Sequence, residues 1–402
     1  MVKRITLVTS GHLSSCPRLI KEAKYFLSLG HKVNVVSIES IDRIYQKDIE
    51  LSKSLMWEVK MINWNGKGLN TLIFKTLSIL VYYISNFINK HSRFFQKNTY
   101  WLYREVSKLE SDLIIAHQFN SFMAVSLMKK HFKFVYDVED AYAFMEKGAT
   151  IDNFNSKIKS LEEKYIRNID VILYSSPLYK QLYESIYNIN TSSEIIYNVF
   201  NVYSKPTSDY EFTDRVDLSK IGIYWFSQTI GLDRGIQQFL SILDQLNLTN
   251  WEVHLRGAHT SNVKNQILKS LQHQYSRENI YFHQPVSIDE LIYKNKEYDI
   301  GLALEDTSSL NRDYCISNKL FDYMSAGLSI IYSNTKGQTS ILGNYNDYFL
   351  EYNEKDLDNF KLKLSELLTN KEFLMKSKIK SRELSTIYNI QVEQLKYNFL
   401  LS

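Results

Sequence analysis

Short apolar segments alternate with amphipathic helical segments along most of the chain, and this alternation is what most constrains the fold. In the first half, the segments that read as strands are residues 5–9, 32–37, 59–62, 112–116, 133–138, 171–174 and 195–197. Helical periodicity fills the stretches between them, the longest of which runs from residue 69 to residue 109. Strands separated by helices indicate a parallel, doubly wound α/β sheet.

The alternation stops once and then begins again. Residues 201–217 are polar, contain Pro206 and lack periodicity, which is typical of a linker. Further strands are expected at residues 221–226, 252–256, 279–282, 299–304 and 329–332. Because 402 residues are too many for one ordinary core, we expect two Rossmann-like domains, residues 1–205 and 206–385, that face each other across a cleft.

Composition and missing motifs exclude several classes of protein. The net charge of +4 is spread along the chain, whereas a nucleic-acid-binding protein needs clustered cations. Cys16 and Cys315 are the only cysteines, which fits a reducing, cytoplasmic compartment. After the first strand there is one glycine, Gly11, where a nicotinamide-binding fingerprint needs three, and the chain has no P-loop sequence. Hydride transfer and the commonest kinase and ATPase functions are therefore disfavoured.

A helix that begins near Ser317 carries the clearest functional signal. Leu320, Phe321 and Met324 recur at helical spacing and should face a core, and Gly327 ends the helix before a short strand. Ser317 can cap the helix, so that the amides of the first turn remain available to an anion.

The other flank of this helix is polar. Asn318 and Asp322 are separated by four residues and share that flank, with Lys319 beside them. One helical turn spans about 5.4 Å, close to the separation of a diphosphate from its own ribose. Such a helix can bind a nucleotide, with phosphates at its amide end and ribose hydroxyls on the carboxylate.

The same segment resembles a known family. Asn318-Lys-Leu-Phe-Asp-Tyr-Met-Ser-Ala-Gly327, followed by an apolar strand, is similar to the donor-binding segment of bacterial family 4-type glycosyltransferases of the GT-B fold. The resemblance implies transfer of a sugar from a nucleotide diphosphate sugar to a hydroxyl of a glycan or lipid-linked acceptor, in surface polysaccharide biosynthesis. It also implies retention at the anomeric carbon, no metal, no cofactor besides the co-substrate, and a final helix, residues 386–402, that packs back on the first domain.

The expected site residues come from the resemblance and, for Ser317 and Arg256, from their places at a helix start and after a strand. The donor-binding set is Ser317, Asn318, Lys319, Asp322, Arg234 and Arg256. Arg234, Lys319 and His117 are the expected catalytic residues. The cationic side chains of Arg234 and Lys319 can neutralise the leaving diphosphate. The sequence departs from the family at Tyr314, which replaces the first of two glutamates, and at residues 225–228, where a Gly-Arg pair is absent.

The first domain should bind the acceptor. His117 follows a strand of this domain, and the resemblance implies that it lies near the donor sugar, where a neutral imidazole hydrogen-bonds a sugar hydroxyl; the alternative is a histidine satisfied by neighbouring backbone. The expected acceptor contacts are Gly11, His12 and Asp140. Glu139 stands where related proteins often have histidine, so it carries no assigned role.

One segment raises the question of a membrane. Residues 69–88 are the most apolar stretch, and residues 89–97 mix cations with aromatic rings. A core helix of the first domain is the favoured interpretation, and peripheral contact with the inner face of the membrane is the alternative. For function, two rivals stay open: a nucleotide-sugar 2-epimerase of the same fold, and a non-catalytic binding or scaffold subunit.

Overall fold

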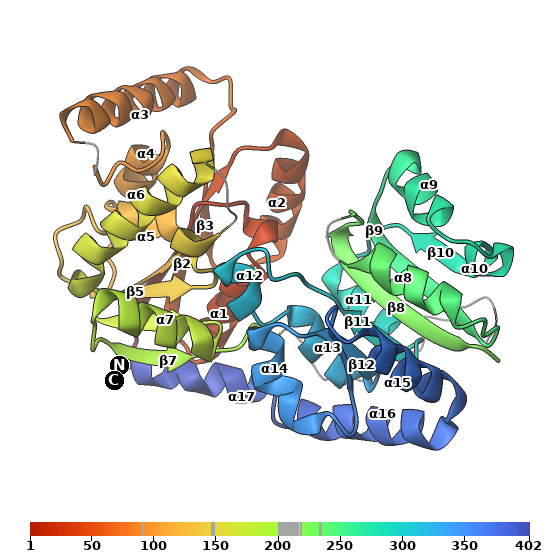
Figure 1. Cartoon of the computed structure of the whole chain (residues 1–402). Helices are drawn as coiled ribbons and strands as arrows, with labels where there is room; N and C mark the ends of the chain where they lie inside the picture. The colour runs from red at the N-terminus through yellow and green to blue at the C-terminus, as the bar shows by residue number, and fades with distance from the viewer. Residues whose placement is uncertain (90–91, 146–148, 200–216, 218, 233–234) are drawn as a thin grey trace. The chain divides into compact units, whose positions relative to one another are not determined.

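The computed structural model describes residues 1–89, 92–145, 149–199, 217, 219–232 and 235–402 (Figure 1). Contacts divide the chain into two compact units, Met1–Asn198 with Gln394–Ser402, and Val199–Glu393. The predicted domain boundary at residues 205 and 206, and all but residue 217 of the predicted linker, lie outside the described residues.

The first unit is built on a seven-stranded parallel sheet of order β3-β2-β1-β4-β5-β6-β7. Its strands are β1 Arg4–Thr9, β2 Lys32–Glu39, β3 Glu58–Asn63, β4 Leu113–His117, β5 Lys133–Val138, β6 Val171–Tyr174 and β7 Ser192–Ile195. The predicted strands are confirmed, except that the last one ends where the expected strand begins. Register places Thr9 opposite His117 and His117 opposite Asp137, so these residues meet at one edge of the sheet.

The helices of the first unit are α1 Pro17–Ser28, α2 Asp42–Ser54, α3 Leu69–Ile88, α4 Thr99–Val106, α5 Phe119–Val125, α6 Ala149–Tyr165 and α7 Pro177–Tyr187. The chain end returns to this unit, as predicted. α17 Ile390–Leu395 leads into a short 3-10 helix, Lys396–Leu400, whose Tyr397 and Leu400 are fully buried in the first core. The Tyr397 ring contacts Phe26 of α1 edge-on at 5.8 Å.

The second unit has a six-stranded parallel sheet of order β10-β9-β8-β11-β12-β13. Its strands are β8 Ile221–Thr229, β9 Trp251–Ala258, β10 Ile280–His283, β11 Ile300–Ala303, β12 Ser329–Ser333 and β13 Leu350–Tyr352. The first five were predicted and β13 was not. With three residues, β13 is too short to show a period.

The helices of the second unit are α8 Ile236–Gln245, α9 Ser261–Lys269, α10 Gln274–Glu278, α11 Ile288–Asn295, α12 Leu310–Tyr314, α13 Asn318–Ala326, α14 Lys336–Leu342, α15 Leu357–Thr369 and α16 Lys371–Ser385. The stretch between β9 and β10 holds two helices, α9 and α10. Trp225 and Trp251 lie in the core that α8, α9 and α15 cover on one face of the sheet.

Each sheet reverses its strand order once, between β1 and β4 in the first and between β8 and β11 in the second. In open parallel sheets ligands bind beyond the carboxyl ends of the strands at this point of reversal. Ligand-binding residues are therefore expected in the segments that follow β1, β4, β8 and β11.

Helix α3 does not lie in a core, so the prediction of a core helix is wrong. Ser78 is its only buried residue. Nine large apolar side chains of α3 are exposed, namely Leu69, Leu72, Ile73, Leu77, Leu80, Tyr83, Ile84, Phe87 and Ile88. Hydrophobicity along the sequence cannot tell a core helix from an exposed apolar one, because both have the same composition.

Candidate functional site

Helix α13 is held tightly against the strand that precedes it. A Cβ atom on Gly301 of β11 would lie 2.3 Å from Cγ of Tyr323, so only glycine lets the helix approach so closely. The Tyr323 hydroxyl donates to the carbonyl of Leu302 at 3.2 Å. Leu320, Phe321 and Met324 are buried, which confirms the predicted core face of the helix. The start of α13 is therefore fixed at the reversal point of the second sheet.

The amino end of α13 has no side-chain cap. Ser317 occupies the N-cap position, but its hydroxyl accepts no hydrogen bond there, so the expectation that it caps the helix is wrong. Serine, threonine or asparagine side chains do cap α7, α9, α11, α12, α14 and α16. The Leu320 amide donates to the Ser317 carbonyl at 3.0 Å, and the amides of Asn318 and Lys319 keep their capacity to bind an anion, together with the positive end of the helix dipole.

Asp322 lies one turn along α13 on the same flank as Asn318, and both side chains are partly buried. Among the described residues, no donor is bonded to the Asp322 carboxylate. Burial raises the pKa of Asp322 to about 7, and the nearby charge of Lys319 only partly opposes this. A partly buried carboxylate that has no donor of its own near a helix start can accept hydrogen bonds from hydroxyls of a ligand.

Lys319 is buried and held by two contacts. Its ammonium lies 3.1 Å from Oε1 of Glu305, at the end of β11, and 5.8 Å from the centre of the Trp225 ring. An ammonium has three donors, so this one can keep Glu305 and still contact a phosphate. Sequence reasoning found Lys319 and missed Glu305, which is fourteen residues away and belongs to no motif.

A pocket of about 360 Å³ opens at the carboxyl ends of β11, β12 and β13. Glu305 lines it, together with Asp306 and Ser308 of the same loop and residues 333–335 and 352–355. The same carboxylate that orients Lys319 thus faces a polar pocket large enough for part of a ligand.

Two arginines, Arg234 and Arg256, were predicted to bind the donor. Arg234 lies outside the described residues. Arg256 is buried, and its guanidinium donates to the Tyr224 hydroxyl at 2.9 Å and to the carbonyl of Gln284 at 3.0 Å. Arg256 therefore ties β8 to the segment after β10, and a phosphate contact from it stays a prediction.

In the first unit, His117 is fully buried among carboxylates. Its Nε2 lies 3.0 Å from Glu22, and its Nδ1 lies 3.2 Å from Asp137 and 3.1 Å from Glu139. Burial alone would lower the pKa of His117, but the charge of Glu22 and the bonds to Asp137 and Glu139 outweigh it and raise the pKa well above the ordinary value. The prediction of a neutral imidazole is therefore wrong, because both ring nitrogens face acids.

Arg18 of α1 completes this network and was not predicted as a site residue. It donates to both oxygens of Asp137, at 2.6 and 2.9 Å, and to the carbonyl of Ile196 at 2.7 Å. Tyr397 from the returning chain end donates to Glu22 at 2.6 Å. The network thus joins α1, β4, β5 and the C-terminal segment, and it positions the loops beyond them.

Gln118 follows His117 and has a backbone conformation rarely seen outside glycine, with φ of 66°. Its Oε1 accepts from the Ser10 hydroxyl at 2.8 Å, beside Gly11 at the end of β1. Strained residues of this kind cluster at ligand sites, which makes Gln118 a candidate that no sequence motif could indicate. Asp140 is partly buried just past β5, so its expected acceptor contact stays a prediction.

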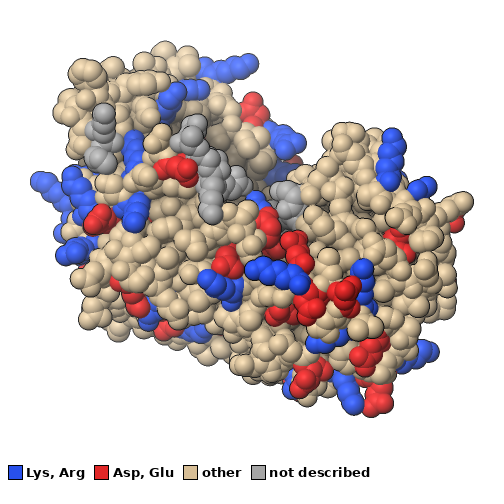
Figure 2. All heavy atoms as spheres, in the orientation of Figure 1, with Lys and Arg blue, Asp and Glu red and all other residues tan. Residues whose placement is uncertain are grey.

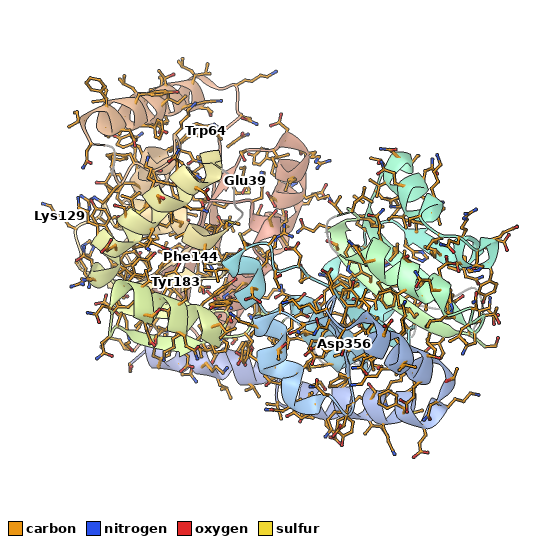
Figure 3. All side chains as sticks on the ribbon, viewed as in Figure 1. Glu39, Trp64, Lys129, Phe144, Tyr183 and Asp356 are labelled. Atoms are coloured by element: carbon orange, nitrogen blue, oxygen red, sulfur yellow. The ribbon has the colours of Figure 1, made fainter. Side chains whose placement is uncertain are left out.

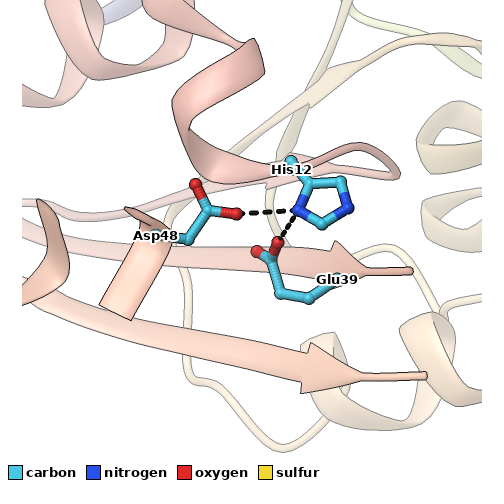
Figure 4. Close-up of side chains that lie close together, drawn as sticks. All are labelled: His12, Glu39 and Asp48. Carbon is cyan, nitrogen blue, oxygen red and sulfur yellow. Dashed lines mark hydrogen bonds and ion pairs between the residues drawn. The ribbon is translucent and has the colours of Figure 1, made fainter. Parts of the chain in front are cut away.

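His12, another predicted acceptor contact, is buried and fully occupied (Figure 4). Its Nε2 accepts from the backbone amides of Ser40 and Ile41, at 3.1 and 2.9 Å. Nδ1 therefore carries the proton, and it points to Asp48 at 2.8 Å and to Glu39. The ring holds the loop after β1 in place rather than offering a free nitrogen to a ligand.

Two clusters among the described residues bring enough acids and histidines together to suggest a metal: His12 with Glu39 and Asp48, and Glu22 with His117 and Asp137. In the first, the protonated Nδ1 cannot ligate. In the second, the Arg18 guanidinium already occupies the Asp137 carboxylate. Both clusters are thus explained by hydrogen bonds and ion pairs within the protein.

Comparison with solved structures identifies the fold. No protein-family model matches the chain, and no curated protein matches it in sequence. Among solved structures, HepE from Anabaena, in complex with UDP and glucose, superposes with a TM-score of 0.70 at 10% identity, covering 99% of both chains. TarM, described from S. aureus, gives 0.69 at 10% identity over 100% and 99% of the two chains. WaaG, a glycosyltransferase involved in lipopolysaccharide biosynthesis, gives 0.65 at 12% identity over 98% of both. These neighbours are GT-B glycosyltransferases, and the chain has the GT-B fold.

Proposed function

We propose that the chain is a glycosyltransferase that takes a sugar from a nucleoside diphosphate sugar and attaches it to a hydroxyl of a glycan or lipid-linked acceptor. The observation that carries the proposal is the start of α13. There an uncapped helix end, the Lys319 ammonium and the Asp322 carboxylate, to which no described residue donates, lie together at the reversal point of the second sheet.

The chemistry of these groups suits a nucleotide. The first-turn amides of α13 and the Lys319 ammonium stabilise the negative charge that develops on a departing diphosphate. Asp322, one turn on, accepts hydrogen bonds from the ribose hydroxyls of the same nucleotide. The Glu305 carboxylate keeps the ammonium in place before the donor binds, so little reorganisation is needed during the reaction.

Two further considerations support the proposal. HepE and TarM have each been crystallised with UDP, so UDP is the first nucleotide to test on this chain. The similarity of residues 318–327 to the family 4-type donor segment favours retention at the anomeric carbon without a metal. A role in surface polysaccharide synthesis, in the reducing cytoplasm that a chain with only two cysteines suits, belongs to the same proposal.

The first experiment is a thermal-shift panel of UDP, GDP and CDP on the wild type and on Asp322→Ala. A diphosphate at about 100 times its Kd should stabilise the wild type by about 2.7 kcal/mol, and most of that should vanish in the variant. If none of the diphosphates shifts the wild type, the non-catalytic scaffold becomes the better account.

A second experiment separates transfer from epimerisation. The nucleotide sugar identified by the panel is incubated with and without glycan or lipid-linked acceptors, and nucleotide release is followed. A transferase consumes the donor rapidly only when an acceptor is present. Conversion of the donor sugar without any acceptor would instead identify the 2-epimerase.

A further inference from the structure

Helix α3 shows its apolar side outwards. Its exposed large apolar side chains follow one another at helical spacing, and Leu80, Ile84 and Phe87 among them are 52%, 50% and 92% exposed. In a helix on the surface of a globular protein these side chains would face the core. Figure 1 shows α3 at the outer edge of the first unit. This helix therefore has an apolar face for which the first unit itself provides no cover among the described residues.

The inner side of α3 is attached to the first unit by specific contacts. The Arg104 guanidinium lies 3.8 Å from the centre of the Phe74 ring, and that ring is 5.8 Å from Trp101. Asn86 donates to the carbonyl of Phe94 at 2.9 Å and accepts from Lys157 at 2.8 Å. A helix that crossed a bilayer would lose all of these bonds, so α3 is arranged to lie along a surface.

The sequence that contains α3 is rich in cations, and Glu105, just beyond it, lies 4.0 Å from one of them, Lys60. Residues 59–104 contain seven lysines or arginines and no aspartate or glutamate. In Figure 2 the surface at the upper left, where α3 lies, is mostly tan, with blue side chains and a few red ones at its border. Cations next to an apolar helix face match a surface that is apolar inside and negatively charged at its boundary.

Aromatic rings line a pocket of about 350 Å³ beside α3. Trp64, labelled in Figure 3, Tyr82, Phe95 and Phe154 contribute the rings, and Lys97 contributes a cation. Tryptophan and tyrosine are favoured at the boundary between lipid and water, where one side of the ring is apolar and the other is wet. The pocket thus extends the same chemistry from α3 onto its neighbours.

We propose that α3 is a docking surface for an anionic lipid bilayer, in which its outer face lies among the acyl chains and the surrounding cations contact the headgroups. This would hold the first unit at a membrane, where a lipid-linked acceptor is found. The docking itself needs no nucleotide, so it stands or fails separately from the proposed transferase activity.

The test is flotation of the full chain with vesicles that contain roughly 30 mol % phosphatidylglycerol, compared with vesicles of phosphatidylcholine alone. The wild type should bind the anionic vesicles and lose binding as salt rises from about 0.05 M to about 0.5 M. The triple variant Ile73→Gln, Leu80→Gln, Phe87→Gln should bind at least about tenfold more weakly. Glutamine keeps helix propensity, so its melting temperature should stay close to that of the wild type.

The matched control changes three apolar residues of similar exposure outside the first unit: Leu362→Gln, Met375→Gln and Ile387→Gln, which are 73%, 56% and 56% exposed. It should float like the wild type. The proposal is overturned if the wild type does not bind, if it binds both kinds of vesicle equally, or if the α3 variant binds as well as the control. It is also overturned if light scattering shows a wild-type dimer that the α3 variant makes monomeric, or if alkaline carbonate fails to release the bound protein.

Discussion

Replacing Asp322 by asparagine should make the protein more stable and its nucleotide binding weaker. The carboxylate is partly buried without a hydrogen-bond donor among the described residues, and burial raises its pKa to about 7. Keeping an ionised group there costs stability that a neutral amide of the same size does not. Function is the natural reason to retain such a group.

The size of the stability effect follows from the cost of burying a polar group without a partner, about 1–3 kcal/mol in proteins. Because the folded-state pKa lies above the ordinary 3.8, the stability contributed by the protonated form is complete below about pH 4 and is lost as the pH rises through about 7. Asp322→Asn should therefore raise the melting temperature most at about pH 8, by about 2–4 °C per kcal/mol, raise it less at about pH 5, and leave it unchanged only below about pH 4.

Binding should respond in the opposite direction. Loss of a hydrogen bond to a charged group costs about 1.5–3 kcal/mol, which is about 10- to 100-fold in the Kd of a nucleoside diphosphate. The wild type should bind about tenfold more tightly at about pH 8 than at about pH 6 through Asp322, relative to the variant. Calorimetry and thermal melts measure both effects, with Asp358→Asn, at an exposed position of α15, as the control. If Asp322→Asn destabilises the protein at pH 8 and binds UDP normally, the reasoning is refuted.

Three other substitutions test the supports of the sites, each by denaturant unfolding. Gly301→Ala should cost about 1–3 kcal/mol, because its Cβ would lie 2.3 Å from the Tyr323 ring. Arg18→Met should cost about 3 kcal/mol by leaving the buried Asp137 without its main partner. Burial and the hydrogen bond with Asp48 raise the pKa of Glu39 to about 8. The stability of the wild type should therefore fall by about 2 kcal/mol from about pH 6 to about pH 9, and Glu39→Gln should remove this pH dependence.

Matched controls isolate each cause. Gly68→Ala meets no atom within 4 Å, so it should change stability by less than about 0.5 kcal/mol. Lys24→Met lies on α1 like Arg18 but is exposed, and Glu58→Gln is an exposed counterpart of Glu39; both should be nearly neutral. Equal effects in a variant and its control would show that the named contact is not the cause.

Local patterns predicted the parts of the fold that they encode. The strands β5 and β6 were predicted with their observed ends, because each is a buried apolar run bounded by polar residues. The core face of α13 followed from the spacing of Leu320, Phe321 and Met324. The exposure of α3 could not be predicted, since it depends on which side of the helix contacts α4 and not on composition.

The site residues that could not be predicted are those whose partners are far away in the sequence. Glu305 orients Lys319 from another loop, and Arg18 meets Asp137 across 119 residues. No local pattern marks such pairs. His117 was found because it ends a strand, but its charge state depends on Glu22 and Glu139, which only the folded chain brings to it.

The most direct test of the account is a crystal structure of the chain with UDP, or with whichever diphosphate binds. We predict the diphosphate at the first-turn amides of α13 within hydrogen-bonding distance of Lys319, and the ribose hydroxyls on the Asp322 carboxylate. A nucleotide bound elsewhere, with the start of α13 empty, would contradict the central claim.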